Sequence, residues 1–263
     1  MSKETAGSRT NTMKNQFAGK AALVTGSSQG IGLAVARTLA ERGAAVTLNY
    51  PGEKERDIAE LAVRRIRDAG GKAVAVMADV TSVPQIGRLF EEAQAAHGPL
   101  DFVVSNVGGT PGFAKFEDAD EALWDRTNVL SAKSMFFVLK EAARCVRDGG
   151  RIVGISSTTI RIPYPGVAIY AGAKAAVEVY CKTLAKEVGH RGITVNCIAP
   201  GLTLTEGVDV YGVTPDRYEY VKSITPLGRL AESQDIADTV MTVLSDDAHW
   251  LTGQFIPAAG GLV

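Results

Sequence analysis

The stretch TGSSQGIG, Thr25 to Gly32, separates the apolar run AALVT from an amphipathic segment that continues to Arg42. The apolar run predicts a buried strand, and the segment from Ile31 onwards predicts a helix. Glycines at 26, 30 and 32 let the backbone turn tightly and approach a bound group closely. Because the amino terminus of a helix offers free N–H groups and a positive dipole, the turn indicates a pyrophosphate site. A plain strand-to-helix turn is the alternative.

Short apolar runs alternate with longer helical patterns along the rest of the chain, which is typical of βαβ units and a parallel sheet. Further strands are predicted in the runs AAVTLNY, KAVAVMADV, DFVVSN, RIVGIS, TVNCIA and QFIPA. Helices are predicted over about 31–42, 53–69, 83–97, 120–146 and 170–190, with one more before the last strand. The pattern predicts an α/β fold with one doubly wound parallel sheet of about seven strands and helices on both faces. Ligands of such a sheet bind beyond the carboxyl ends of its strands.

Length and composition predict a single domain. The chain has 263 residues, of which 46% are apolar, enough for one large core. We expect a flexible tail over residues 1–16 and the domain over 17–263, with a substrate loop at about 201–229. The 28 basic and 29 acidic residues leave a net charge of −1, which gives no reason to expect nucleic acid or an anionic membrane as a partner.

The three cysteines, Cys145, Cys181 and Cys197, cannot all pair with one another, and none has a second Cys or a His at metal-ligand spacing. We therefore expect a reducing compartment, a cytoplasmic protein and no bound metal. The first residues lack the apolar run of a signal peptide, and no apolar segment approaches membrane-spanning length. The expected partner is a small molecule.

The glycine-rich turn argues against one class of nucleotide site. A P-loop needs Lys followed by Ser or Thr after its last glycine, whereas Ile31 and Gly32 stand here. A dinucleotide is therefore preferred to a nucleoside triphosphate. S-adenosylmethionine stays open as a cofactor on this evidence alone.

The end of the second predicted strand bears on the choice of dinucleotide. Asn49 stands there in place of the acidic residue that would bind a ribose 2′-hydroxyl, so a 2′-phosphate meets no repulsion. Lys54 and Arg56 could add positive charge, although Glu53 and Glu55 are interleaved and a solvated helix start is equally compatible. NADP(H) is favoured, and NAD(H) stays open.

The segment YAGAKAAVEVY places Tyr170 and Lys174 four residues apart, and hence on one face of a predicted helix. A phenol has a pKa of about 10, so a neighbouring ammonium that stabilises its anion would ease proton exchange near neutral pH. The segment YEYVK repeats the pattern at Tyr218 and Lys222, within the irregular part of the chain. Tyr170 is preferred because it follows a predicted strand that ends in serines.

Five motifs, TGSSQGIG, SNVGG, IVGISS, YAGAK and NCIAPG, occur in the order and rough spacing of the short-chain dehydrogenase/reductase (SDR) family. The chain resembles this family from about Gly19 to its carboxyl end. The resemblance implies a Rossmann-type domain, a nicotinamide cofactor, and hydride transfer between that cofactor and a ketone or secondary alcohol. The usual assembly of the family is a tetramer, so a homotetramer is expected.

The resemblance also implies four catalytic residues. Tyr170 would donate or accept the proton, and Lys174 would tune it and bind the nicotinamide ribose. Ser157 would hydrogen-bond the substrate carbonyl, and Asn128 would hold a water in the proton relay. Ser156 competes with Ser157, but only Ser157 stands thirteen positions before Tyr170, the family's usual separation.

A set of cofactor contacts follows from the same resemblance. Asp79 matches an aspartate that contacts the adenine, Asn106 an asparagine that braces the central strand, and Thr205 a threonine near the carboxamide or the phosphates. The expected contacts are Gly26, Ser28, Gln29, Gly30, Ile31, Gly32, Asn49, Tyr50, Asp79, Val80, Asn106, Gly108, Tyr170, Lys174, Pro200, Gly201, Thr203 and Thr205.

Three positions depart from the family pattern. Val107 replaces the commoner alanine of Asn-Ala-Gly and adds bulk near the adenosine ribose. Gln29 stands where many NADP-preferring relatives carry a basic residue, which weakens the preference for NADP(H). The sequence AAGG at 258–261 lacks the aspartate often found before the two glycines.

The segment between the sixth strand and the last helix has the composition of a lid over the substrate. No Arg or Lys lies between Leu202 and Pro215, which favours a neutral ketone or alcohol, although Arg217, Lys222 and other regions could reach the pocket. The lid residues are expected to be Val208, Val210, Tyr211, Val213, Tyr218 and Tyr220.

Alternative functions stay open at this point. One is an NAD-dependent alcohol dehydrogenase, and a non-enzymatic one is a dinucleotide-binding regulatory protein. A methyltransferase would leave the catalytic serine, tyrosine and lysine without a joint purpose. A 3-oxoacyl-acyl-carrier-protein reductase would need a basic docking patch, to which these arginines could contribute: Arg144, Arg147, Arg151 and Arg191.

Overall fold

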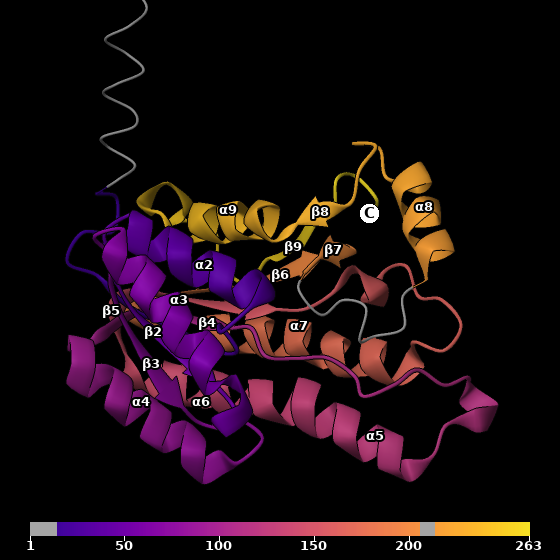
Figure 1. Ribbon diagram of the computed structural model, residues 1–263, viewed down its shortest axis with the longest axis horizontal. Coiled ribbons are helices and arrows are strands. Elements are labelled where there is room, and N and C mark those ends of the chain that lie inside the picture. Colours follow the sequence, from indigo (N-terminus) through magenta and orange to yellow (C-terminus); the bar gives the residue numbers. More distant parts are fainter. Residues whose placement is uncertain (1–14, 206–213) are drawn as a thin grey trace, which may run out of the picture.

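The computed structural model describes residues 15–205 and 214–263, and a seven-stranded parallel sheet runs through its centre (Figure 1). The strand order is β3-β2-β1-β4-β5-β6-β9, so the chain crosses over between β3 and β4 and leaves a crevice beyond the carboxyl ends of β1 and β4. This order confirms the predicted doubly wound fold. The strands are β1 (Ala21–Val24), β2 (Ala45–Tyr50), β3 (Lys72–Met77), β4 (Leu100–Ser105), β5 (Val146–Ile155), β6 (Thr194–Pro200) and β9 (Phe255–Ala258).

Helices cover both faces of the sheet. Figure 1 shows α2 and α9 along one side and α4, α5 and α6 along the other. The α-helices are α2 (Gly30–Glu41), α3 (Arg56–Asp68), α4 (Val83–His97), α5 (Glu121–Asn128), α6 (Ser134–Cys145), α7 (Ala168–Val188), α8 (Pro215–Ile224) and α9 (Ser233–Leu244). Shorter turns are η1 (Glu53–Glu55), η2 (Phe116–Asp118), η4 (Thr158–Ile160), η5 (Gly189–Arg191) and η7 (Asp246–Ala248), and η3 (Val129–Lys133) is a π-helical turn.

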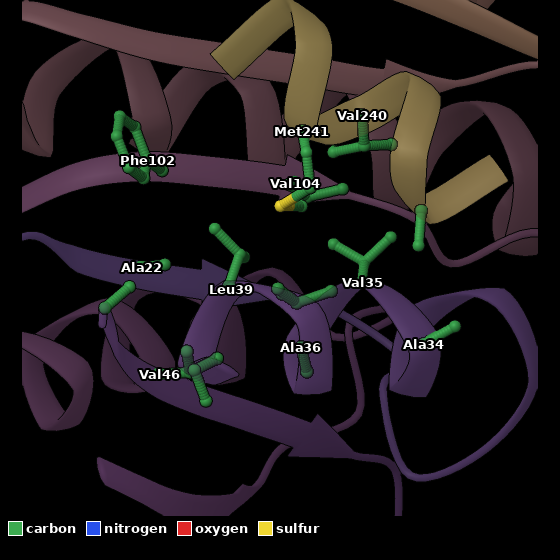
Figure 2. Packing of buried hydrophobic residues seen from close by; sticks show 14 of the residues in the cluster. Ala22, Ala34, Val35, Ala36, Leu39, Val46, Phe102, Val104, Val240 and Met241 are labelled. Atoms are coloured by element: carbon green, nitrogen blue, oxygen red, sulfur yellow. The ribbon is translucent and has the colours of Figure 1, made fainter. Parts of the chain in front are cut away.

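One apolar core joins α2 and α9 to the sheet. Figure 2 shows Val35 and Leu39 of α2 pointing towards Val104 of β4 and Met241 of α9, and all four side chains are fully buried. Removing a side chain of this size from water stabilises the fold by about 1.5–3 kcal/mol. The first helix after the glycine turn is therefore fixed by packing along its length.

The second core lies between the opposite face of the sheet and α4, α6 and α7. Its contributions from α7 recur at Val177, Cys181 and Leu184, three and four residues apart, as one helical face requires. Lys174 precedes Val177 by three residues and belongs to the same stripe. Its side chain is only 2% exposed, because the packing of α7 carries position 174 inwards.

Two elements differ from the sequence predictions. The helix predicted over 120–146 is divided into α5, the π-helical turn η3 and α6. Strand β5 begins at Val146 rather than Arg151, with a register irregularity where it pairs with β4. The extra length is stabilised by Arg147, whose guanidinium forms an ion pair with the buried carboxylate of Asp101.

The segment 201–229 is only partly described. It contains α8 and β7 (Thr203–Leu204), which pairs with β8 (Ala231–Glu232). The predicted lid residues Val208, Val210, Tyr211 and Val213 lie outside the described residues, whereas Tyr218 and Tyr220 belong to α8. At the far edge of the main sheet, Pro257 of β9 stands opposite Ala199 of β6. In the described ranges, none of the helices has both the length and the apolar character needed to cross a membrane.

Candidate active site

The glycine turn between β1 and α2 forms a closely packed backbone cradle. Gly26 and Gly30 both have φ of 58°, a conformation that favours glycine. A side chain on Gly32 would overlap the carbonyl oxygen of Gly26 and the amide of Asn106, and one on Gly26 would come within 2.7 Å of Val107. The N-cap residue of α2, Gln29, makes no side-chain capping bond, and the first turn contains no acidic residue. The positive helix end therefore faces the crevice without a carboxylate, which fits a bound pyrophosphate.

Asn106 holds the two sides of the crevice together. Its backbone N–H donates to Thr25 Oγ1 at 3.0 Å, and its side-chain amide donates to the carbonyls of Thr25 and Gly26 at 3.0 and 3.1 Å. The carboxyl ends of β1 and β4 are thus joined directly beside the glycine turn. This is a bracing role of the kind that the resemblance implies for Asn106.

Asn49 is placed differently from the expectation. Its side chain is 1% exposed; Oδ1 accepts the N–H of Gly26 at 3.1 Å, and Nδ2 donates to the carbonyl of Ala78 at 2.8 Å. The amide connects the glycine turn to the end of β3, so it does not face a ribose. The neighbouring Tyr50 is also buried, at 6%. The chain first reaches solvent after β2 at Pro51.

The charged residues just after β2 differ in whether they could bind a 2′-phosphate. Arg56 forms an ion pair with Glu53 at 2.5 Å, and this carboxylate raises the pKa of the guanidinium. Lys54 is exposed, and no ion pair involves it within the described ranges. Of the two basic residues expected to favour an added phosphate, Lys54 is the one without an ion pair in the described ranges.

Asp79 and Val80 follow β3 on the same side of the sheet. The carboxylate of Asp79 accepts bonds from the N–H and hydroxyl of Thr81 at 2.9 and 2.8 Å, and its own N–H donates to Gln85. Val80 is buried in the core with α4. The half-buried carboxylate is held by these local bonds, and the adenine contact that the resemblance implies for Asp79 stays a prediction.

The serines after β5 point in different directions. Ser156 Oγ donates to the backbone carbonyl of Lys174 at 2.9 Å, which fastens β5 to α7. Ser157 is 9% exposed, and its Oγ accepts bonds from the N–H and the hydroxyl of Thr159 at 3.2 and 3.0 Å. Ser157 Oγ accepts both bonds within its own loop, whereas the Ser156 hydroxyl donates to α7.

The Tyr170–Lys174 pair lies in the first turns of α7. Lys174 Nζ donates to the carbonyl of Ile155, the last residue of β5, at 2.9 Å, and lies 6.0 Å from the centroid of the Tyr170 ring. Burial lowers the pKa of Lys174 from its ordinary value of 10.5 to about 8. The Tyr170 side chain is half-buried. A buried ammonium beside a partly accessible phenol is an arrangement suited to proton transfer.

Sequence reasoning did not identify Ser131, which holds the loop against this lysine. Its hydroxyl donates to the carbonyl of Gly109 at 2.6 Å and accepts the N–H of the same residue at 2.8 Å. Gly108, one residue earlier, lies so close to Lys174 that a methyl group there would overlap Nζ. Ser131 belongs to the π-helical turn η3, a feature often found at functional sites, and this irregularity is the signal that marks it.

Asn128 stands immediately before that turn. Its Nδ2 donates to the carbonyl of Trp124 at 2.9 Å, and the side chain is half-buried. Asn128 ends α5, and both α5 and the π-helical turn η3 contact α7. The relay role that the resemblance implies for Asn128 stays a prediction.

The segment after β6 closes the crevice from the other side. Pro200 ends β6 and its carbonyl accepts the Thr158 hydroxyl at 3.1 Å, and Thr203 Oγ1 donates to Gly201 at 2.9 Å. A side chain on Gly30 would meet Thr205 at 3.5 Å. Thr205 therefore lies against the glycine turn, far from it in sequence and adjacent in space.

The second Tyr–Lys match lies elsewhere. Tyr218 and Lys222 are on α8, where Lys222 forms an ion pair with Glu219 at 3.6 Å on the surface. The Lys222 side chain is 51% exposed, in contrast to the buried Lys174. A solvated ammonium stabilises a phenolate far less than a buried one.

The arginines considered as a docking patch are engaged by acids of the same chain. Arg191 also donates to the carbonyls of Ala143 and Val146 at 2.6 Å. Across the described ranges, no group of three or more His, Cys, Asp and Glu side chains is arranged to hold a metal ion. The ion pairs are Arg144–Glu141, Arg147–Asp101, Arg151–Asp246 and Arg191–Asp148.

The structure has a glycine turn suited to a pyrophosphate at the switch point of a doubly wound sheet. Beside it lie a buried lysine and a tyrosine. Together these features define a Rossmann-fold oxidoreductase. A family model described as enoyl-(acyl carrier protein) reductase matches residues 26–263. The chain belongs to the short-chain dehydrogenase/reductase family.

Individual relatives agree with this assignment. The chain is 41% identical over 259 residues to a hydroxynaphthalene reductase-like protein, Arp2, of Metarhizium brunneum, with 94% of this chain and 96% of the relative covered. A short-chain dehydrogenase of Burkholderia cenocepacia in complex with NADP is 31% identical with a TM-score of 0.87, and 94% and 99% of the two chains are covered. The angucycline C-6 ketoreductase LanV with bound NADP is 34% identical with a TM-score of 0.87, and 94% and 97% are covered.

Proposed function

We propose that this protein is an NADPH-dependent carbonyl reductase that converts a ketone to a secondary alcohol. The observation that carries the proposal is the buried Lys174 ammonium between the Ile155 carbonyl and Gly108, on the same helical face as Tyr170. This position favours a phenolate, and therefore favours release of the Tyr170 proton. A dinucleotide-binding regulator would not require such a pair.

Each residue has one task in the proposed reaction. A bound nicotinamide supplies the hydride. Tyr170 Oη donates its proton to the carbonyl oxygen, and Ser157 Oγ hydrogen-bonds the same oxygen and holds it in place. The Lys174 ammonium stabilises the resulting phenolate, and Asn128 orders the water through which the proton is replaced. In the oxidative direction Tyr170 acts as the base.

NADP(H) is the proposed cofactor. Two of the related structures named above contain NADP. The exposed Lys54 stands close to the end of β2, where its ammonium would attract a 2′-phosphate. The backbone turn at 26–32 and Asn106 would hold the pyrophosphate end, and Lys174 and Thr205 the nicotinamide end.

The proposed substrate is a ketone on an aromatic ring system. The names of two relatives, a hydroxynaphthalene reductase-like protein and an angucycline ketoreductase, support this class. The description of the family model favours a second candidate, reduction of the C=C bond of an enoyl thioester. The pairing of the candidate patch arginines with acids makes an acyl carrier protein partner the weaker choice, and an NAD-dependent alcohol dehydrogenase remains the alternative for direction and cofactor.

We further propose a cytoplasmic homotetramer. The three cysteines are free thiols, as expected in a reducing compartment. Light scattering at micromolar concentration tests the assembly, and a monomeric mass would contradict it.

The deciding experiment has a binding arm and a turnover arm. NADPH and NADH are titrated separately into the purified protein by fluorescence at fixed salt, and then α-tetralone and crotonyl thioester are offered as substrates. We expect at least tenfold tighter binding of NADPH, equal to about 1.4 kcal/mol, and turnover of the ketone. Tyr170→Phe should bind NADPH normally and abolish turnover, whereas the control Tyr218→Phe should retain it. Unchanged ketone reduction by Tyr170→Phe would overturn the proposal.

A further inference from the structure

A guanidinium in contact with two aromatic rings lies at the same end of the molecule as the candidate site. The Arg217 guanidinium lies 4.3 Å from the centroid of the Tyr164 ring and 5.4 Å from that of Tyr220. Phe113 adds a third ring, tilted at 52° with its centroid 6.3 Å from Tyr164. Contacts of a cation with ring faces at these distances are attractive and orient its plane.

The rings come from segments that follow three neighbouring strands. Tyr164 belongs to the loop that joins Ser157 to Tyr170, between the proposed carbonyl-binding residue and the proton donor. Phe113 follows β4 and packs against Gly166 of that loop, where the N–H of Ala114 donates to Gly166 at 3.2 Å. Arg217 is on α8, after β6 and β7. The stack therefore lies beyond the carboxyl ends of β4, β5 and β6, on the ligand-binding side of the sheet.

Arg217 differs in its charge environment from the arginines that pair with acids. Within residues 15–205 and 214–263, no carboxylate forms an ion pair with it, and its guanidinium lies over the rings of Tyr164 and Tyr220. Arginines with an acidic partner are Arg37, Arg42, Arg56, Arg64, Arg88, Arg144, Arg147, Arg151, Arg161, Arg191 and Arg229.

Its geometry restricts what this cation can bind. A ring covers one face of the guanidinium, so the N–H groups at its edge are the donors left for a ligand. Burial raises the pKa of the Tyr164 phenol and Arg217 opposes this change, so the ring stays neutral at pH 7. A planar ring system with an oxygen acceptor at its edge could pack against the aromatic side chains and accept a hydrogen bond from the guanidinium.

We propose that Arg217 determines substrate specificity by binding a phenolic or carboxylate oxygen at the far end of a planar aromatic ketone, whose rings pack on Tyr164 and Phe113. This inference rests on the proposed function and deepens it. It also modifies the expectation of a neutral substrate, which rested on the absence of Arg and Lys between Leu202 and Pro215.

The test compares two ketones that differ by one oxygen, 6-hydroxy-α-tetralone and unsubstituted α-tetralone. Arg217→Met keeps most of the apolar part of the side chain and removes the guanidinium. Arg217→Lys keeps the positive charge but not the planar set of N–H donors. The control is Arg161→Met, because Arg161 also stacks on a ring, that of Phe255 at 4.2 Å, but pairs with Glu178. Thermal melting verifies that each variant folds.

We expect Arg217→Met to raise the KM for the hydroxylated ketone about tenfold, because one charge-assisted hydrogen bond is lost. The value of kcat for both ketones, and the KM for unsubstituted α-tetralone, should stay within about twofold of wild type. Arg217→Lys should fall between, and Arg161→Met should leave the ratio of the two KM values unchanged. An equal effect of Arg217→Met on both ketones would overturn the inference.

A binding measurement separates this inference from the proposed function. Isothermal titration of 2-naphthoate into the NADPH-bound protein should show tighter binding to wild type than to Arg217→Met, whether or not either ketone is turned over. Equal affinity of 2-naphthoate for both proteins would contradict the role of Arg217 even if ketone reduction is observed. Absence of ketone turnover with a retained affinity difference would contradict only the reductase assignment.

Discussion

Gly108 lies directly against the ammonium group of Lys174, with no room for a side chain between them. A methyl group on Gly108 would overlap Nζ and approach Cε to 2.9 Å. Because Lys174 Nζ also donates to the Ile155 carbonyl at 2.9 Å, it is enclosed between the loop after β4 and the end of β5. The position of the candidate catalytic lysine thus depends on a residue that has no side chain.

Gly108→Ala should displace Lys174 and reduce kcat for ketone reduction about a hundredfold, as misplacement by about 1 Å can do. The overlap should also lower the free energy of unfolding by about 1–3 kcal/mol. Steady-state kinetics and thermal melting measure the two effects. Gly87→Ala in α4 is the control, since nothing lies within 4 Å of the added methyl and a slight gain in stability is expected. Wild-type kinetics in Gly108→Ala would contradict the contact.

Ser131→Ala should destabilise the protein by about 1–3 kcal/mol, because it leaves the N–H and the carbonyl of buried Gly109 without partners. Urea unfolding measures this change, and NADPH titration should show weaker binding. In the control Ser134→Ala, the lost bond goes to the helical carbonyl of Leu130, and a smaller change is expected. If the two variants unfold at the same urea concentration, the hydroxyl of Ser131 does not stabilise the loop.

Lys174→Met should abolish reduction and stabilise the fold at pH 7. A fall in the Lys174 pKa from 10.5 to about 8 corresponds to a cost of about 3 kcal/mol for keeping the buried ammonium charged. The lost bond to Ile155 offsets about 1 kcal/mol of this gain.

The pH dependence of that gain has a definite sign. Between pH of about 8 and 10.5 the unfolded chain holds more protons at Lys174 than the folded one, so wild-type stability from this residue rises with pH. The advantage of Lys174→Met should therefore be full below pH 8 and vanish above about 10.5. Calorimetry at pH 7 and pH 10 tests this, with exposed Lys182→Met as the control. An advantage that does not shrink with pH would contradict the buried charge.

Ketone reduction at saturating NADPH should decline above a pH of about 8. The Lys174 ammonium is lost there, and the apparent pKa belongs to the Tyr170–Lys174 pair rather than to either residue. A rate profile from pH 6 to 10 measures it. A flat profile up to pH 10 would show that the ammonium charge is not required.

Asn49→Asp should destabilise the protein by about 3 kcal/mol without selecting NADH over NADPH. A buried carboxylate could still accept from Gly26 but could not donate to Ala78, and its charge would be poorly compensated. Chemical denaturation and cofactor titration measure both consequences. Asn15→Asp at an exposed position is the control for the change in charge. A clear switch to NADH would show that position 49 does reach the ribose.

The sequence was most informative where local patterns decide the structure. The strand–turn–helix at Thr25–Gly32 and the helix carrying Tyr170 and Lys174 follow from hydrophobic periodicity and glycine placement. The doubly wound parallel sheet of about seven strands was also predicted correctly, because βαβ units leave few possible topologies.

Other features depend on contacts between distant segments, and the sequence did not predict them. The π-helical turn η3 was merged into one long helix, because five residues are too few to separate its period from that of an α-helix. The bond between Ser131 and Gly109 follows from that turn and was missed with it. Asn49 was expected to face the cofactor, but it is buried. Its burial is set by bonds to Gly26 and Ala78, which lie on separate segments of the chain, so the local sequence could not reveal it.

Pro257 gives the outer edge of the sheet a further property. The carbonyls of Gln254 and Ala258 bond towards β6, so the alternating direction of a strand turns Pro257 outwards. An outward proline lacks the N–H that an incoming strand would need, and it is exposed. Pairing of another chain with the free edge of β9, the first step of cross-β aggregation, is thereby hindered.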